Sequence, residues 1–110
     1  MGLLRPAGID ITLHAMELAA PENGAALLDV GCGDGIAAAA ASAEFGLRAY
    51  GVDIRSEAVE MARQAGVEAV VCDAAKLDFQ DESFDIVMME CVFSALEKPA
   101  EAVREAHRVL

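Results

Sequence analysis

Apolar residues in the 110-residue chain fall into short blocks that alternate with longer segments of mixed character. The short blocks are apolar on both alternating faces, which is typical of parallel strands buried on both sides of a sheet. The longer segments are rich in alanine or carry apolar residues at helical spacing. Four strands are predicted, at residues 25–30, 47–52, 67–72 and 84–90, and four helices, at 9–20, 36–44, 56–65 and 99–110. This order predicts an α/β fold with a mostly parallel sheet.

Local signals mark the ends of several predicted helices. Gly46 and Gly66 follow two of them, as C-terminal glycines do, and Ser56 is expected to cap the helix at 56–65 with its hydroxyl. Pro99 suits the first turn of the last helix. The apolar side of that helix is expected to carry Val103, Ala106, His107 and Leu110.

Length and composition indicate one globular domain over residues 1–110, with 55% hydrophobic and 25% charged residues. No apolar run reaches the roughly 18 residues of a spanning helix, and the N-terminus lacks a signal sequence, so we expect no membrane partner. Cys32, Cys72 and Cys91 form no CxxC pair, which favours reduced thiols and a cytoplasmic protein. The formal charge of −11 would repel polyphosphates, so a nucleic-acid partner is not expected.

The strongest chemical signal is the glycine pattern Gly31-x-Gly33-x-Gly35 between a predicted strand and a predicted helix. Glycines permit a tight turn and close approach of a ligand, and a helix N-terminus offers N–H groups to an anion. The dinucleotide-binding fingerprint would need glycine or alanine at position 36, where this chain has Ile36. A charged small molecule is therefore expected, and a nicotinamide- or flavin-dependent oxidoreductase is disfavoured.

Carboxylates stand at the ends of three predicted strands: Asp29, Asp53 and Asp73. In a parallel sheet these ends meet at one edge, where ligands of open α/β folds bind. Asp53 can accept two hydrogen bonds from a ribose diol, or it can cap the helix that begins near Ser56. Asp29 can also bond the N–H groups of the glycine loop, alongside any ligand role.

Three segments carry a resemblance to a known family. Residues 27–35, LLDVGCGDG, resemble motif I of class I S-adenosylmethionine-dependent methyltransferases. Residues 81–87, DESFDIV, resemble the segment that leads into the fourth strand of that family, and residues 100–110 resemble the helix that follows. The resemblance implies a Rossmann-like sheet with strand order 3-2-1-4 and S-adenosylmethionine as the cofactor.

The resemblance also implies roles for single residues. The glycine turn would hold the amino-acid end of the cofactor through Gly31, Cys32, Gly33 and Gly35, and Asp29 would meet its ammonium group. Asp53 would bind the ribose, Asp73 the adenine amino group, and the N–H of Ala74 the adenine ring. Ile54 and Leu77 would flank the adenine, or they are ordinary core residues.

Glu90 lies at the end of the predicted fourth strand, next to the family's site for the transferable methyl group. It could orient the cofactor or act as a base, because methyl transfer mainly needs alignment and a base only for a protonated acceptor. The alternative is a solvated acid at a strand end. Chemistry at the three cysteines is disfavoured because buried thiols are usually inert, and His14 and His107 lack metal-ligand spacing, so no metal site is predicted.

The family's sheet has seven strands, whereas this sequence ends at Leu110, before the last three. We therefore expect a truncated methyltransferase fold, and a methyltransferase function with an unidentified small molecule as acceptor. The alternative is a non-catalytic S-adenosylmethionine-binding module that self-associates or needs a partner. The edge of the strand at 84–90 is the expected homo-oligomer contact, because exposed strand edges recruit other strands.

Overall fold

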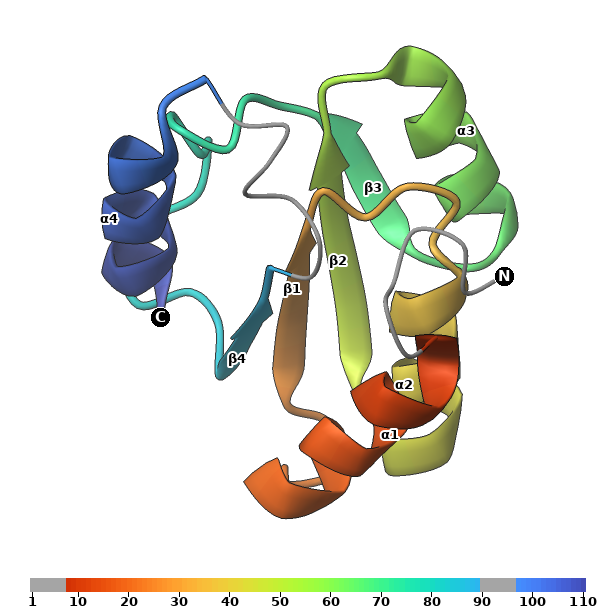
Figure 1. Ribbon diagram of the computed structural model, residues 1–110. Helices are drawn as coiled ribbons and strands as arrows, with labels where there is room; N and C mark the ends of the chain where they lie inside the picture. The colour runs from red at the N-terminus through yellow and green to blue at the C-terminus, as the bar shows by residue number, and fades with distance from the viewer. Residues whose placement is uncertain (1–7, 90–96) are drawn as a thin grey trace.

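The computed structural model describes residues 8–89 and 97–110, and it has the predicted α/β architecture (Figure 1). Four parallel strands form one sheet in the order β3-β2-β1-β4, which confirms the predicted order. The strands are β1 (Ala26–Val30), β2 (Arg48–Asp53), β3 (Glu68–Val71) and β4 (Ile86–Met88). The helices are α1 (Gly8–Ala19), α2 (Ile36–Phe45), α3 (Ser56–Gln64) and α4 (Pro99–Val109). None of the described helices is long and apolar enough to cross a bilayer.

Helices cover both faces of the sheet, with α4 on one side and α1, α2 and α3 on the other (Figure 1). Side chains alternate along β1, so Leu28 and Val30 pack in one core with Val109 of α4. Leu27 points to the opposite face and packs with Met16 of α1. Every residue of β1 is consequently buried, as the apolar run predicts for a central parallel strand.

The fourth strand is shorter than predicted, since β4 pairs with β1 only over Ile86–Met88. Phe84 contacts α4 instead, because its N–H donates to the Val109 carbonyl at 2.9 Å and its ring lies in the core. Asp85 joins the sheet end through its side chain, which accepts the Ala26 N–H at 2.8 Å. Glu90, the predicted end of this strand, lies outside the described residues.

Two predicted helix ends are confirmed, and the predicted cap of α3 is wrong. Gly46 ends α2 in the left-handed conformation, and Gly66 follows α3 with a φ of +96°. Ser56 is the first residue of α3 and not its cap, which is Arg55, with no side-chain cap bond. The Ser56 hydroxyl donates instead to Glu57 at 3.1 Å.

The predicted contact side of α4 is wrong as well. Val103 and Leu110 are 47% and 52% exposed, whereas Ala102 and Val109 are 1% and 0% exposed. Both buried residues belong to a stripe at i, i+3, i+4 and i+7 that also holds Glu105 and Ala106. This stripe consists mainly of small and polar residues, so a prediction based on large apolar side chains does not identify it.

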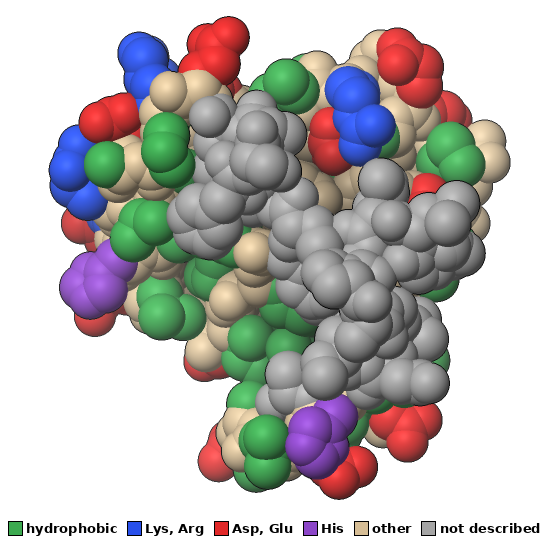
Figure 2. Space-filling view, in the orientation of Figure 1, with side chains coloured by type: hydrophobic (Ala, Val, Ile, Leu, Met, Phe, Trp, Pro, Cys, Tyr) green, Lys and Arg blue, Asp and Glu red, His purple; other side chains and the backbone are tan. Residues whose placement is uncertain are grey.

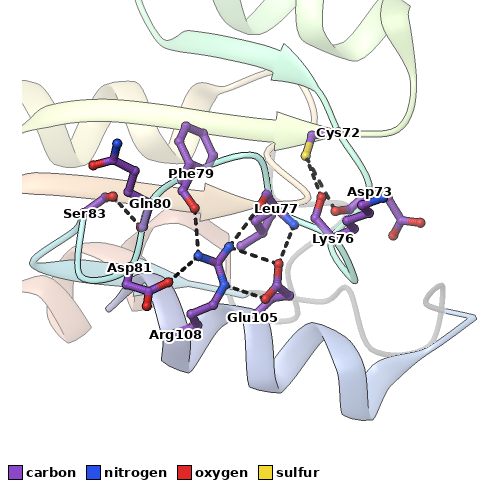
Figure 3. Close-up of polar contacts among 10 residues, drawn as sticks. All are labelled: Cys72, Asp73, Lys76, Leu77, Phe79, Gln80, Asp81, Ser83, Glu105 and Arg108. Carbon is purple, nitrogen blue, oxygen red and sulfur yellow. Dashed lines mark hydrogen bonds and ion pairs between the residues drawn. The ribbon is translucent and has the colours of Figure 1, made fainter.

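Polar bonds join α4 to the crossover between β3 and β4 (Figure 3). Arg108 donates to the carbonyls of Leu77 and Phe79 at 3.0 and 2.8 Å, and to the Asp81 carboxylate at 2.7 Å. Glu105 accepts the Leu77 N–H at 2.8 Å and pairs with Arg108 at 2.7 Å. The crossover therefore has a defined path immediately after the predicted adenine-binding residues.

Candidate cofactor-binding site

The glycine turn follows β1 and lies against β2. Gly31, Gly33 and Gly35 have φ angles of +74°, +56° and +80°, a region that favours glycine. The N–H groups of Gly31 and Cys32 both donate to the Val52 carbonyl, at 2.8 and 2.9 Å. Bonds to β2 thus hold the turn at the carboxyl end of the sheet.

Two glycines of the turn face different surroundings. A Cβ built on Gly35 would lie 2.8 Å from the Ala62 Cα and 3.2 Å from Val67 Cγ2, so Gly35 allows the turn to pack against α3 and the residue that precedes β3. On Gly33, the nearest described atom to such a Cβ is Arg55 Nη2, at 3.9 Å. Among the described residues, only the movable Arg55 side chain approaches this side of Gly33, so Gly33 is the glycine whose free side suits a ligand, while Gly35 serves packing.

Cys32 can present only its backbone to a ligand at the turn, because its side chain points into the core. Its side chain is fully buried, and a Cβ built on Gly51 would lie 2.8 Å from the Cys32 sulfur. Burial, and then the negative charges of Asp29 and Asp53, raise the pKa of the thiol to about 12. Gly51 was not predicted as part of this region, although a glycine inside a strand signals a close approach of this kind.

The three predicted acids lie at one edge of the sheet. Asp29 is in β1 and 1% exposed, Asp53 ends β2 and is 6% exposed, and Asp73 follows β3 and is exposed. The register sets Val30 beside Val52 and Asp53 beside Val71, so the carboxyl ends of the three strands meet. The structure therefore places the three residues at the same edge of the sheet, as their spacing predicts.

Asp53 is bonded on both carboxylate oxygens. Oδ2 accepts the Gly33 N–H at 3.0 Å and Arg55 Nη2 at 3.2 Å. Oδ1 accepts the Arg55 backbone N–H and Nε, both at 3.0 Å. Burial alone would raise the pKa of Asp53, but these bonds from Arg55 and Gly33 outweigh it and hold the pKa below its usual value.

Arg55 is the site residue that the sequence prediction missed. Its only signal in the sequence is a cation two residues after a strand-end acid. Asp53 accepts the N–H of Arg55, which precedes the first residue of α3, Ser56. Among the described contacts Asp53 accepts no N–H from α3 itself, so it does not cap this helix.

The turn after β3 places Asp73 at the surface and Ala74 in the core. The Asp73 carboxylate accepts the Ala75 N–H at 2.9 Å, and the Asp73 carbonyl accepts the Lys76 N–H at 3.0 Å. The Ala74 side chain is 7% exposed and belongs to the core that α4 covers. Backbone and carboxylate, rather than the alanine side chain, are thus what this turn can present.

The two residues predicted either to flank an adenine or to fill the core differ from each other. Leu77 is 5% exposed and lies in the core with Phe84, so it is a core residue. Ile54 is 70% exposed beside Asp53, so it is not a core residue. An exposed isoleucine next to a candidate ribose-binding acid can cover a flat apolar ring.

Carboxylates accept two of the N–H groups at the glycine turn and the start of α2. The Ile36 N–H donates to the Asp34 carboxylate at 3.1 Å, and the Gly33 N–H donates to Asp53. Two of the N–H groups expected to face an anion are therefore already bonded to acidic side chains. On the described part of the face in Figure 2, Lys and Arg stand at separate places beside acidic residues and form no continuous basic surface. This arrangement suits a cationic or zwitterionic ligand better than a phosphate.

Comparison with known proteins identifies the family. A family model described as a methyltransferase domain matches residues 28–110. Human "Probable tRNA methyltransferase 9B" is 37% identical over 90 residues, which are 79% of this chain and 19% of that protein.

Solved structures are similar over almost the whole chain. The crystal structure of MccD protein gives a TM-score of 0.89 at 26% identity, covering 96% of this chain and 50% of that one. Phosphoethanolamine N-methyltransferase 2 of Haemonchus contortus, solved with phosphomonomethylethanolamine and S-adenosylhomocysteine, gives 0.84 at 30% identity, covering 96% of this chain and 27% of that one. This chain thus spans between 19% and 50% of the lengths of these three relatives. The family model covers residues 28–110, and the sheet has the order β3-β2-β1-β4 that the resemblance to this family implies. The chain therefore belongs to the class I S-adenosylmethionine-dependent methyltransferase family.

Proposed function

We propose that this chain binds S-adenosylmethionine at the carboxyl ends of β1, β2 and β3, as the cofactor-binding part of an enzyme that methylates a small molecule. The observation that carries the proposal is the meeting of Asp29, Asp53 and Asp73 beside the glycine turn. When bound, the cofactor would supply a methyl group on a positively charged sulfur.

The chemistry of the site fits this ligand. S-adenosylmethionine carries an ammonium and a sulfonium, and the site has buried carboxylates at Asp29 and Asp53. Carboxylates also bond the N–H groups of Gly33 and Ile36, which a pyrophosphate would need. Ile54 offers an exposed apolar side chain for the adenine.

Each residue would have a distinct task. Asp53 would accept the ribose hydroxyls and Asp29 would meet the ammonium group. Asp73 would accept the adenine amino group, with the Ala74 N–H at the ring. The backbone of the turn at Gly31, Cys32, Gly33 and Gly35 would hold the amino-acid end, with Gly33 closest to the ligand.

Glu90 remains the residue proposed to contact the acceptor or to act as a base, on the grounds of its sequence position alone. Methyl transfer is an in-line displacement, so most of the protein's contribution is alignment of donor and acceptor. A base is needed only when the acceptor carries a proton.

A small-molecule acceptor is favoured by the charge of the chain, −11, which opposes binding to a polyphosphate. A tRNA acceptor is the second candidate, because the human relative is named as a probable tRNA methyltransferase. Filter binding of bulk tRNA at 50 and 200 mM salt separates the two. Tight binding that weakens steeply with salt would favour tRNA.

A cytoplasmic location is proposed with either acceptor, since Cys32 and Cys72 are free thiols.

Isothermal titration with S-adenosylhomocysteine tests the cofactor proposal. Asp53→Asn should weaken binding about tenfold or more, since hydrogen bonds to a charged group contribute about 1.5–3 kcal/mol. Glu68→Gln is the matched control, because it removes one exposed acid at the other end of β3. Absence of binding to the unmodified chain, or equal affinities for the two variants, would remove the ribose assignment.

A non-catalytic binding module remains the alternative to an enzyme. Release of label from methyl-labelled S-adenosylmethionine, measured with candidate amine, thiol and carboxylate acceptors, separates the two. Binding without transfer to any acceptor would favour the module.

A further inference from the structure

The acceptor positions of the Asp53 carboxylate are already filled. A carboxylate has about four lone-pair positions on its two oxygens. Asp53 accepts four hydrogen bonds, from the backbone N–H groups of Gly33 and Arg55 and from Nε and Nη2 of the Arg55 guanidinium. A ribose diol that donates two hydroxyls to Asp53 therefore needs two of these donors to leave.

The donors differ in their freedom to leave. The two N–H groups belong to the glycine turn and to the residue that caps α3, so their positions follow from the fold. The guanidinium is carried on a long side chain that is 56% exposed, while the Asp53 side chain is only 6% exposed. Exchange of the guanidinium for hydroxyls leaves the backbone unchanged, and the released cation can be hydrated.

The guanidinium also lies over the turn. Arg55 Nη2 is the nearest described atom to a Cβ built on Gly33, at 3.9 Å. Gly33 is the glycine whose open side suits a ligand. The same guanidinium therefore covers both the ribose acceptor and the adjoining surface of the turn.

We propose that Arg55 is an affinity-determining residue, whose guanidinium competes with the ribose hydroxyls of the cofactor for the Asp53 carboxylate. The inference rests on the proposed function, because it takes Asp53 as the ribose acceptor. Binding exchanges an ion pair for two hydroxyl bonds and uncovers Gly33. The affinity for the adenosyl ligand is consequently lower with Arg55 than without it.

The test compares Arg55→Met with Arg104→Met by isothermal titration with S-adenosylhomocysteine. Arg104 lies on α4 and pairs only across the helix surface with Glu101 among the described contacts, so its variant loses the same charge away from the turn. Arg55→Met should bind about two- to fivefold more tightly than the unmodified chain, as for loss of a half-exposed ion pair. Arg104→Met should bind as the unmodified chain does.

A second ligand and a second variant sharpen the outcome. The 2′,3′-dideoxy analogue of S-adenosylhomocysteine lacks the competing hydroxyls, so Arg55→Met should bring it a smaller gain than it brings the parent ligand. Arg55→Lys keeps the positive charge but lacks the forked N–H donors of the guanidinium, so it should give a smaller gain in affinity than Arg55→Met. The lysine variant also tests the proposal if the methionine variant fails to fold.

Weaker or unchanged binding of S-adenosylhomocysteine by folded Arg55 variants, with binding by the unmodified chain intact, would overturn the competition alone. If neither the unmodified chain nor the folded variants bind, the competition and the proposed function fall together.

Discussion

Replacement of Gly35 by alanine tests the packing of the glycine turn independently of any ligand. The φ of +80° is unfavourable for an L-residue by about 1–2 kcal/mol. The added Cβ would lie 2.8 Å from the Cα and 2.9 Å from the Cβ of Ala62, and overpacking of this kind costs about 1–3 kcal/mol. The free energy of unfolding should therefore fall by about 2–5 kcal/mol, a large share of the roughly 5–15 kcal/mol typical of a domain.

Gly24→Ala and Gly66→Ala are the matched controls for this experiment. Both glycines have positive φ, +86° and +96°, yet a Cβ on either meets no atom of residues 8–89 and 97–110 within 4 Å. They should lose only the conformational contribution of about 1–2 kcal/mol. Urea unfolding followed by circular dichroism measures all three variants. Equal losses for Gly35→Ala and the two controls would refute the contact with α3 as the reason for this glycine.

Four further predictions concern the turn, its titrating groups and the sheet edge. Gly33→Ala should cost about as much stability as Gly24→Ala, because the nearest described atom to its Cβ is Arg55 Nη2 at 3.9 Å. The same change should weaken S-adenosylhomocysteine binding at least about tenfold, because the added methyl group occupies the proposed ligand side of the turn; unchanged titration curves would contradict this. In a Cys91→Ser background, Ellman's reagent at pH 8 should modify half-buried Cys72 in the folded protein, and Cys32, with a pKa of about 12, only after unfolding. Because the pKa of Asp53 is lowered in the folded protein, this carboxylate stabilises the fold at pH values above its ordinary pKa of 3.8. The contribution is lost as the pH falls through the pKa that Asp53 has in the folded protein. The difference in urea midpoint between the unmodified chain and Asp53→Asn should therefore shrink below about pH 4. Finally, β4 pairs with β1 on one side only among the described strands, so sedimentation velocity should show concentration-dependent self-association, and a monomer at every concentration would count against the strand edge as a contact.

The sequence predicted those parts of the molecule that depend on the order of residues along one strand or one turn. β1 is an apolar run followed at once by glycines, and both the fully buried strand and the positive φ angles follow from that. The meeting of Asp53 and Asp73 follows from the same logic, because parallel strands end at one edge. Such features need no knowledge of which side chain touches which.

Features that depend on a contact between elements were missed. The buried stripe of α4 contains two alanines and one charged residue, Glu105. The partners of Glu105 and of the neighbouring Arg108 lie about 30 positions earlier in the chain. β4 begins at Ile86 and not at Phe84, because the Phe84 N–H donates to the Val109 carbonyl at the end of α4. The apolar pattern at 84–90 does not reveal this bond. The bond between Arg55 and Asp53 is close in sequence, yet it depends on a rotamer and on the free side of the turn. Periodicity carries no information of that kind.

The arrangement of charge at the turn explains how a glycine-rich loop of the dinucleotide-binding type can serve a different ligand. In a phosphate site, the N–H groups at the helix start stay available to the anion. Here the carboxylates of Asp34 and Asp53 take the N–H groups of Ile36 and Gly33, so a pyrophosphate would have to break both bonds beside two negative charges. An ammonium or sulfonium gains from the same charges without breaking either bond. The carboxylates of Asp34 and Asp53, rather than the glycines themselves, therefore make the surroundings of this turn more favourable to a cation than to an anion.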